Sequence, residues 1–98
     1  MEARTPVYAS KCYWPDVTEA QVAEATRRAV LEDRSSRAPH AECFGAIVFP
    51  LDDLVLCVFK AASAGDVRRA SERAGMPCER VMEAVWLSGS VNEEQEER

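Results

Sequence analysis

The sequence predicts an α+β domain whose elements follow the order strand, helix, strand, strand, helix, strand. Three observations lead to this prediction: both helices begin at a hydroxyl residue that can cap them, both lie between β-prone runs, and the two middle runs are joined by a short turn. A chain of 98 residues is long enough for one domain. We expect that domain to span residues 1–91 and the acidic segment 92–98 to be a disordered tail.

The first half of the chain predicts a strand followed by a helix. Val7–Trp14 alternates and is rich in β-branched and aromatic residues, and Pro15 ends it. Thr18 can cap the following helix, and Gln21 stands at the reciprocal position of a capping box. Apolar residues at spacings of three and four then continue to a helix end near Arg34.

The next predicted elements form a hairpin. Glu42–Phe49 and Leu54–Ala61 are β-prone, and the segment 50–53 between them contains proline and two aspartates, which are typical of turns. Two strands joined by so short a connection must pair antiparallel.

A second helix and a last strand complete the predicted order. Ser63 can accept a hydrogen bond from the free backbone N–H of Asp66 at the helix start. Gly75 supplies a left-handed residue that closes the helix, and Pro77 prevents it from resuming. The β-prone run Val81–Leu87 follows. We expect Cys78 to lie in the intervening turn and to be the most exposed thiol.

Right-handed crossovers place the first and third strands in the middle of one four-stranded antiparallel sheet, with both helices on one face. This is the ferredoxin-like arrangement. The third strand is apolar on both sides, although the helices of the chain cover only one of them. We therefore expect a homodimer that packs face to face as a dimeric α/β barrel. The two sides of this strand consist of Leu54, Leu56 and Val58, and of Val55, Cys57 and Phe59.

Composition limits the classes of partner. The net charge is −5, with 12 basic and 17 acidic residues, which argues against nucleic acid. The helix arginines are expected to be solvated. No apolar run reaches the ~20 residues that span a membrane, and the first six residues lack the apolar part of a signal peptide. We expect a cytoplasmic protein with no membrane partner, in which the cysteines are buried thiols.

Short motifs along most of the chain, from about Val7 to Leu87, follow the order seen in a known family. The chain resembles a bacterial family of small proteins of unknown function, one branch of which binds nickel and forms a dimeric ferredoxin-like α/β barrel. The Gly-x-Pro segment that leads into an Arg-Val strand is the most specific of these motifs. The residues that carry the resemblance are Pro15–Thr18, Cys57–Ala61 with Ser63, Arg73–Pro77, Glu79–Val81 and Glu83.

The resemblance implies a homodimer and a link to nickel, but not the nickel ligands themselves. The nickel-binding branch carries histidines on the first strand and in the last turn of the second helix. Here the corresponding helix positions are Ala70 and Ala74, and the strand offers Ser10, Lys11 and Cys12. Nickel therefore cannot be assigned residue by residue.

The residues themselves suggest two possible metal sites. His40, the single histidine, precedes Cys43 by three residues, and such a pair could contribute to a site for nickel or another transition metal. An odd spacing on an extended segment points the two side chains to opposite faces, unless the chain bends at Ala41. Cys12 and Cys57 on neighbouring central strands are a second possibility, with buried core thiols as the alternative.

Glu83 interrupts the last apolar strand and is the candidate for acid–base work or ligand binding. The aromatic side chains Tyr13 and Trp86 are its candidate partners around a cavity. The structural alternative is that Glu83 pairs with Lys11 or Lys60 across strands.

Together these observations predict a non-enzymatic, homodimeric protein that binds a small molecule or metal ion. The alternative is a cofactor-independent enzyme that acts on a small apolar substrate in a dimeric α/β-barrel cavity, which rests on fold analogy. A third interpretation is an interaction module that uses residues 92–98 or the open face of the sheet.

Overall fold

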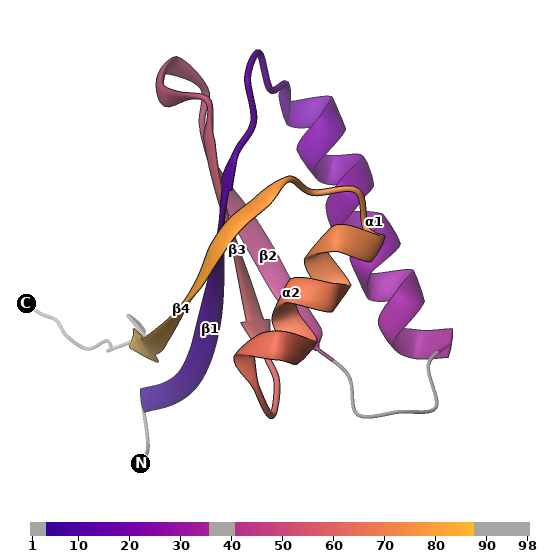
Figure 1. The fold of residues 1–98 in the computed structure, drawn as a ribbon, viewed down its shortest axis with the longest axis vertical. Helices are drawn as coiled ribbons and strands as arrows, with labels where there is room; N and C mark the ends of the chain where they lie inside the picture. Colours follow the sequence, from indigo (N-terminus) through magenta and orange to yellow (C-terminus); the bar gives the residue numbers. More distant parts are fainter. Residues whose placement is uncertain (1–3, 36–40, 88–98) are drawn as a thin grey trace, which may run out of the picture.

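Two helices lie on one face of a four-stranded antiparallel sheet, and neither of them covers the opposite face (Figure 1). The computed structural model describes residues 4–35 and 41–87. The expected acidic tail, 92–98, lies outside this range. The elements are β1 (Arg4–Tyr13), α1 (Glu19–Ser35), β2 (Glu42–Phe49), a 3-10 turn (Pro50–Asp52), β3 (Leu54–Lys60), α2 (Ala64–Arg73) and β4 (Cys78–Leu87).

The sheet order is β2-β3-β1-β4, with every neighbouring pair antiparallel. This order confirms the expected ferredoxin-like arrangement, in which β1 and β3 form the centre. Within the described residues, neither helix has the length and apolar character needed to cross a membrane.

The helix starts follow the capping signals of the sequence. Thr18 and Gln21 form a reciprocal capping box: the Thr18 N–H donates to Gln21 Oε1 at 2.8 Å, and the Gln21 N–H donates to Thr18 Oγ1 at 3.1 Å. At α2, Ser63 Oγ accepts from the Asp66 N–H at 3.2 Å. The Asp66 carboxylate pairs with Arg69 on the next turn.

The start of β4 differs from the prediction. The strand begins at Cys78, not at Val81, because Cys78 pairs directly with Cys12 after a register shift in the β1–β4 ladder. A bulge of this kind adds a residue on one strand and keeps the pairing beyond it. Cys78 therefore belongs to the sheet and is half-buried, so its expected place in an exposed turn is wrong.

The core lies between the sheet and the helices. Val55, Cys57 and Phe59 on β3 are fully buried on the helix side, where Val67 of α2 is also fully buried. Burying side chains of this size contributes about 1.5–3 kcal/mol each. Leu54, Leu56 and Val58 occupy the other face of the same strand and are only half-buried.

Arg28 of α1 ties the two helices together. Its Nε and Nη2 atoms donate to the carbonyl oxygen of Ala74 at 2.9 and 2.8 Å, where α2 ends. A cation at this position satisfies a free carbonyl and complements the negative end of the helix dipole. Gly75 follows with φ of +84°, and a Cβ on it would lie 3.1 Å from Arg28 Nη2.

We predict that Gly75→Ala lowers the free energy of unfolding by about 1–2 kcal/mol, because a side chain is strained in the left-handed region and this one also crowds the Arg28 guanidinium. Urea denaturation followed by circular dichroism measures the change.

Gly65→Ala is the matched control for this prediction. Gly65 lies in the first turn of α2, and its added Cβ would make an ordinary contact of 3.6 Å with Arg69. Alanine favours helix, so this variant is expected to match or exceed the parent in stability. Equal losses in the two variants would contradict the role assigned to Gly75.

Candidate functional site

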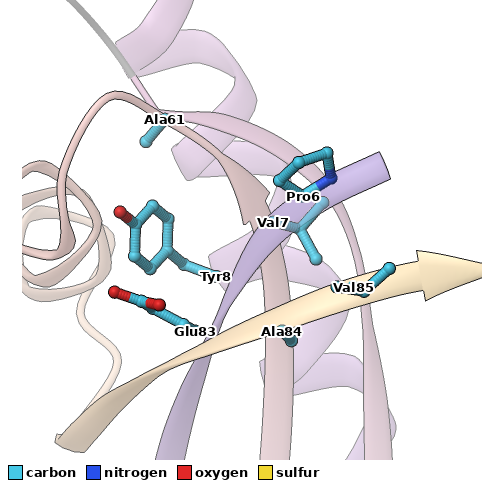
Figure 2. A pocket seen from close by; sticks show the side chains of 7 residues that line it. All are labelled: Pro6, Val7, Tyr8, Ala61, Glu83, Ala84 and Val85. Atoms are coloured by element: carbon cyan, nitrogen blue, oxygen red, sulfur yellow. The ribbon is translucent and has the colours of Figure 1, made fainter. Parts of the chain in front are cut away.

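Glu83 lies on β4 opposite Tyr8 of β1, on the side of the sheet that faces the helices. The two side chains lie side by side and project in the same direction, with Ala61 on the far side of Tyr8 from Glu83 (Figure 2). An open groove of about 460 Å³ lies here. Because Ala61 precedes the start of α2, the groove is beside the loop that leads into this helix. The walls of the groove are Pro6, Val7, Tyr8, Ala61, Glu83, Ala84 and Val85.

The groove combines one carboxylate and one phenol with apolar walls. A carboxylate accepts hydrogen bonds, while a phenol both donates and accepts, so this pair can orient a small ligand that carries a polar or cationic group. The ion pair of Lys11 is formed with Glu79, at 3.6 Å between Nζ and Oε1. Because Tyr8 stands opposite Glu83, the cross-strand pair of Glu83 with Lys11 is not formed.

Tyr13 and Trp86 do not share this groove. Trp86 pairs with Thr5 near the start of β1, and Tyr13 pairs with Leu54 near its end, so the two aromatic residues belong to opposite ends of the helix-free face. Glu83 is three positions before Trp86 on β4, and side chains at an odd spacing point to opposite sides of a strand. Within one protomer the three candidates therefore occupy separate places.

The helix-free face of the sheet is an exposed apolar surface. Ile47 is 50% exposed, Trp86 49% and Phe44 44%. These residues line a small depression of about 170 Å³ together with Val58 in the centre of the sheet. An exposed surface of neighbouring large apolar side chains is unusual in a monomer and is typical of an interaction site.

The metal candidate formed by His40 and Cys43 is described only in part. His40 lies outside the described residues. Cys43 is half-buried near the start of β2, opposite Phe59. Burial raises the pKa of the Cys43 thiol, against a smaller opposing effect of a backbone hydrogen bond from Gly45. Because a metal ligand must be a thiolate, metal binding at Cys43 would have to displace this proton.

The four strands carry one cysteine each, and the register places all four on the helix side of the sheet. Cys12 and Cys57 are fully buried at its centre. Cys57 Sγ lies 3.2 Å from Met76 Sδ, and Ser10 Oγ lies 3.6 Å from Cys12 Sγ and 3.1 Å from Cys78 Sγ. The sulfur atoms of the core therefore meet in one place.

Two buried hydroxyls accompany these sulfur atoms. Ser71 Oγ on α2 donates to Ser10 Oγ on β1 at 2.9 Å, and both side chains are fully buried. Ser10 can then direct its own proton to a neighbouring sulfur, so each hydroxyl is satisfied. Sequence reasoning missed Ser10, Ser71 and Met76 as members of this cluster, since nothing local to them indicates which strand they face.

The Cys12 and Cys57 thiols titrate as a pair. A hydrogen bond from the Cys57 thiol lowers the pKa of Cys12 to about 7; burial opposes this effect and the Ser10 hydroxyl adds to it. The same hydrogen bond with Cys12, together with burial, raises the pKa of Cys57. The first proton that leaves the pair is therefore that of Cys12, and the second is held more tightly.

Comparison with known proteins finds no match to this chain among protein-family models, curated proteins or solved structures. The resemblance to the bacterial family with a nickel-binding branch therefore stays a prediction. In the part of the chain that the structure describes, no group of three or more histidine, cysteine or acidic side chains is placed to hold a metal ion.

We predict that the free energy of unfolding rises between pH 7 and pH 9 by an amount on the order of 2 kcal/mol. In this range the unfolded chain keeps the Cys12 proton, whose ordinary pKa is 9.0, whereas the folded chain has lost it. Above pH 9 the trend reverses. Cys57 and Cys43 keep their protons in the folded chain because their pKa values are raised, whereas the same thiols ionise in the unfolded chain, so the free energy of unfolding falls as the pH rises further.

Urea titrations at several pH values measure this trend, and two variants of Cys57 test its cause. Cys57→Ser keeps a donor beside Cys12 and is expected to retain the rise, while Cys57→Ala removes the donor and is expected to lose it. Identical pH slopes in the two variants would contradict the hydrogen bond as the cause.

Proposed function

We propose that the protein is a homodimeric binding protein for a small molecule or metal ion, not an enzyme. The observation that carries this proposal is the exposed apolar surface formed by Phe44, Ile47 and Trp86 on the face of the sheet that neither α1 nor α2 covers. A sheet that is apolar on both faces needs cover on both. A second copy of the chain offers an equal apolar surface, and a two-fold axis joins identical surfaces without open ends.

The proposed dimer closes the two sheets face to face as an α/β barrel. The half-buried row Leu54, Leu56 and Val58 on β3 would form the middle of the interface. Lys11 and Arg80 are register partners on the same face, and Lys11 stands directly beside Leu56, so the proposed interface borders a basic pair on its β1–β4 side. Small molecules would then bind between the sheets or, on the helix side of each sheet, in the groove of Glu83 and Tyr8.

We predict that the chain sediments at about twice its mass of 10.9 kDa at micromolar concentration. Ile47→Lys should convert it to a monomer, because burying an unpaired ammonium in an apolar interface costs several kcal/mol. Analytical ultracentrifugation measures both species.

Leu31→Lys is the matched control, since Leu31 is 47% exposed on α1, on the far side of the sheet. This variant is expected to remain a dimer. A parent chain that is monomeric across the micromolar range, or a control that dissociates as readily as Ile47→Lys, would overturn the proposed interface.

The alternative function, a cofactor-independent enzyme for a small apolar substrate, is favoured by one observation, the carboxylate of Glu83 beside the phenol of Tyr8 in an apolar groove. A carboxylate can accept a proton while a phenol donates a hydrogen bond to the developing charge. Both the binding role and this alternative require that the groove accepts a ligand.

We predict that benzylamine, an apolar ring with a cationic group, shifts the amide signals of Tyr8, Ala61 and Glu83 in a two-dimensional NMR titration. Glu83→Gln keeps the size of the side chain but removes its charge, and is expected to weaken this binding severalfold. Shifts confined to Ile47 and Trp86 would instead assign the small-molecule site to the helix-free face.

A further inference from the structure

Three sulfur atoms from different parts of the chain converge in the core. Cys12 comes from β1, Cys57 from β3, and Met76 from the segment between α2 and β4. Their side chains are 0%, 0% and 3% exposed. Met76 Sδ lies 3.2 Å from Cys57 Sγ, which in turn is a hydrogen-bonding neighbour of Cys12. The helices shield this cluster from water.

The register favours a bridging ion over a disulfide. Cys57 pairs directly with Ser10, and Cys12 with Val55, so the two cysteines are diagonal neighbours. Diagonal Cβ atoms on antiparallel strands are somewhat under 7–8 Å apart, whereas a disulfide needs about 3.5–4.5 Å. An ion bound between the two thiolates holds the sulfur atoms farther apart than a disulfide does. Two metal–thiolate bonds of about 2.3 Å separate the sulfur atoms by up to about 4.6 Å, which suits the wider Cβ–Cβ spacing of diagonal neighbours.

Two buried hydroxyl groups lie next to the sulfur atoms, and Ser10 is within hydrogen-bond distance of Cys12 and Cys78. Ser10 and Ser71 are the fully buried polar side chains recorded among the described residues, and they are hydrogen-bonded to each other beside the thiols. Burying hydroxyls in an apolar core is costly unless they have partners. A hydrogen bond from Ser10 to a sulfur would stabilise negative charge on a thiolate, as outer-sphere donors do in metal sites.

Cys78 provides a route to the buried pair. It is half-buried at the start of the edge strand β4, and it is the direct register partner of Cys12. Its sulfur lies 3.1 Å from Ser10 Oγ, which also contacts Cys12. An ion captured by Cys78 could pass to Cys12 by exchange of one thiolate ligand for another.

The donor set selects the ion. Thiolate and thioether sulfur are soft ligands that favour Cu(I). Structural zinc sites use four ligands, and no group of three or more histidine, cysteine or acidic residues is suitably placed within the described residues. Cu(I) is stable with only two thiolates, and a buried site shields it from oxidation.

We propose that Cys12 and Cys57 bind one Cu(I) ion inside each protomer, with Met76 as a third, weaker ligand. Each thiol loses its proton to the solvent as its sulfur bonds to copper, so binding releases two protons and changes no oxidation state. This proposal rests on the proposed function, a protein that binds a small molecule or metal ion, and it identifies that ligand as Cu(I). The site lies within one chain, so a dimer that binds no copper and a monomer that binds copper are distinguishable outcomes.

The test is an anaerobic titration of the reduced, untagged full-length protein with Cu(I) in competition with the chromophoric chelator bathocuproine disulfonate. We expect one Cu(I) per chain to be retained, with a thiolate-to-copper charge-transfer band in the ultraviolet. Cys12→Ser and Cys57→Ser should both abolish retention. Met76→Leu preserves the volume of the side chain and should weaken affinity about tenfold, a loss of the size found for secondary groups of metal sites.

Cys43→Ser is the matched control, because Cys43 lies on the same side of the sheet but is only half-buried at the β2 edge. It is expected to retain one Cu(I). Circular dichroism establishes that each variant is folded, and the Met76→Leu result tests the site even where a core cysteine variant unfolds. Failure to retain copper in the parent chain, equal retention in Met76→Leu and parent, or a Cys12–Cys57 disulfide in peptide maps of the air-exposed protein would each overturn the proposal.

Discussion

The structure depends on the alternation along β3, whose side chains are apolar on both sides of the sheet. The inward row of Val55, Cys57 and Phe59 is fully buried beneath two helices. Among the described residues no helix covers the outward row, whose side chains are half-buried. Each apolar row loses contact with water only when something packs on it. The layer of helices covers the inward row, and the proposed dimer would cover the outward row.

The same alternation determines what each face can do chemically. The helix side holds the thiols, the buried hydroxyls and the groove of Glu83, whereas the helix-free side is apolar around Ile47 and Trp86 and carries Lys11 and Arg80 beside Leu56. The thiols and the Glu83 groove are thus separated from the apolar surface of Ile47 and Trp86 by the thickness of the sheet. A metal ion in the core and a partner chain on the outer face can consequently be bound without competing for residues.

The local elements of the fold could be predicted from sequence because their signals are local. The strand Glu42–Phe49 has its predicted bounds, and the capping residues Thr18 and Ser63 act as expected. The start of β4 was misplaced because Cys78 pairs with Cys12 across a bulge in the β1–β4 ladder, which no short pattern in the sequence announces. The first residue of β4 is therefore determined by strand pairing and not by local β-propensity.

The candidate site was harder to predict, for two different reasons. The separation of Glu83 from Trp86 follows from their odd spacing on one strand and was available in the sequence. The meeting of Met76 with Cys57 was not, because it requires the position of the segment after α2 over the sheet. In the same way Arg28 was expected to be solvated, yet it reaches the carbonyl of Ala74 on the other helix.

The most direct test of the two-sided sheet is native mass spectrometry of the untagged protein, combined with elemental analysis. A face-to-face pair of sheets predicts an ion at twice the mass of the 10.9 kDa chain, together with any small molecule or metal that the protein retains. A bare monomer at micromolar concentration would contradict it, because the exposed apolar face would then be stable in water without a partner.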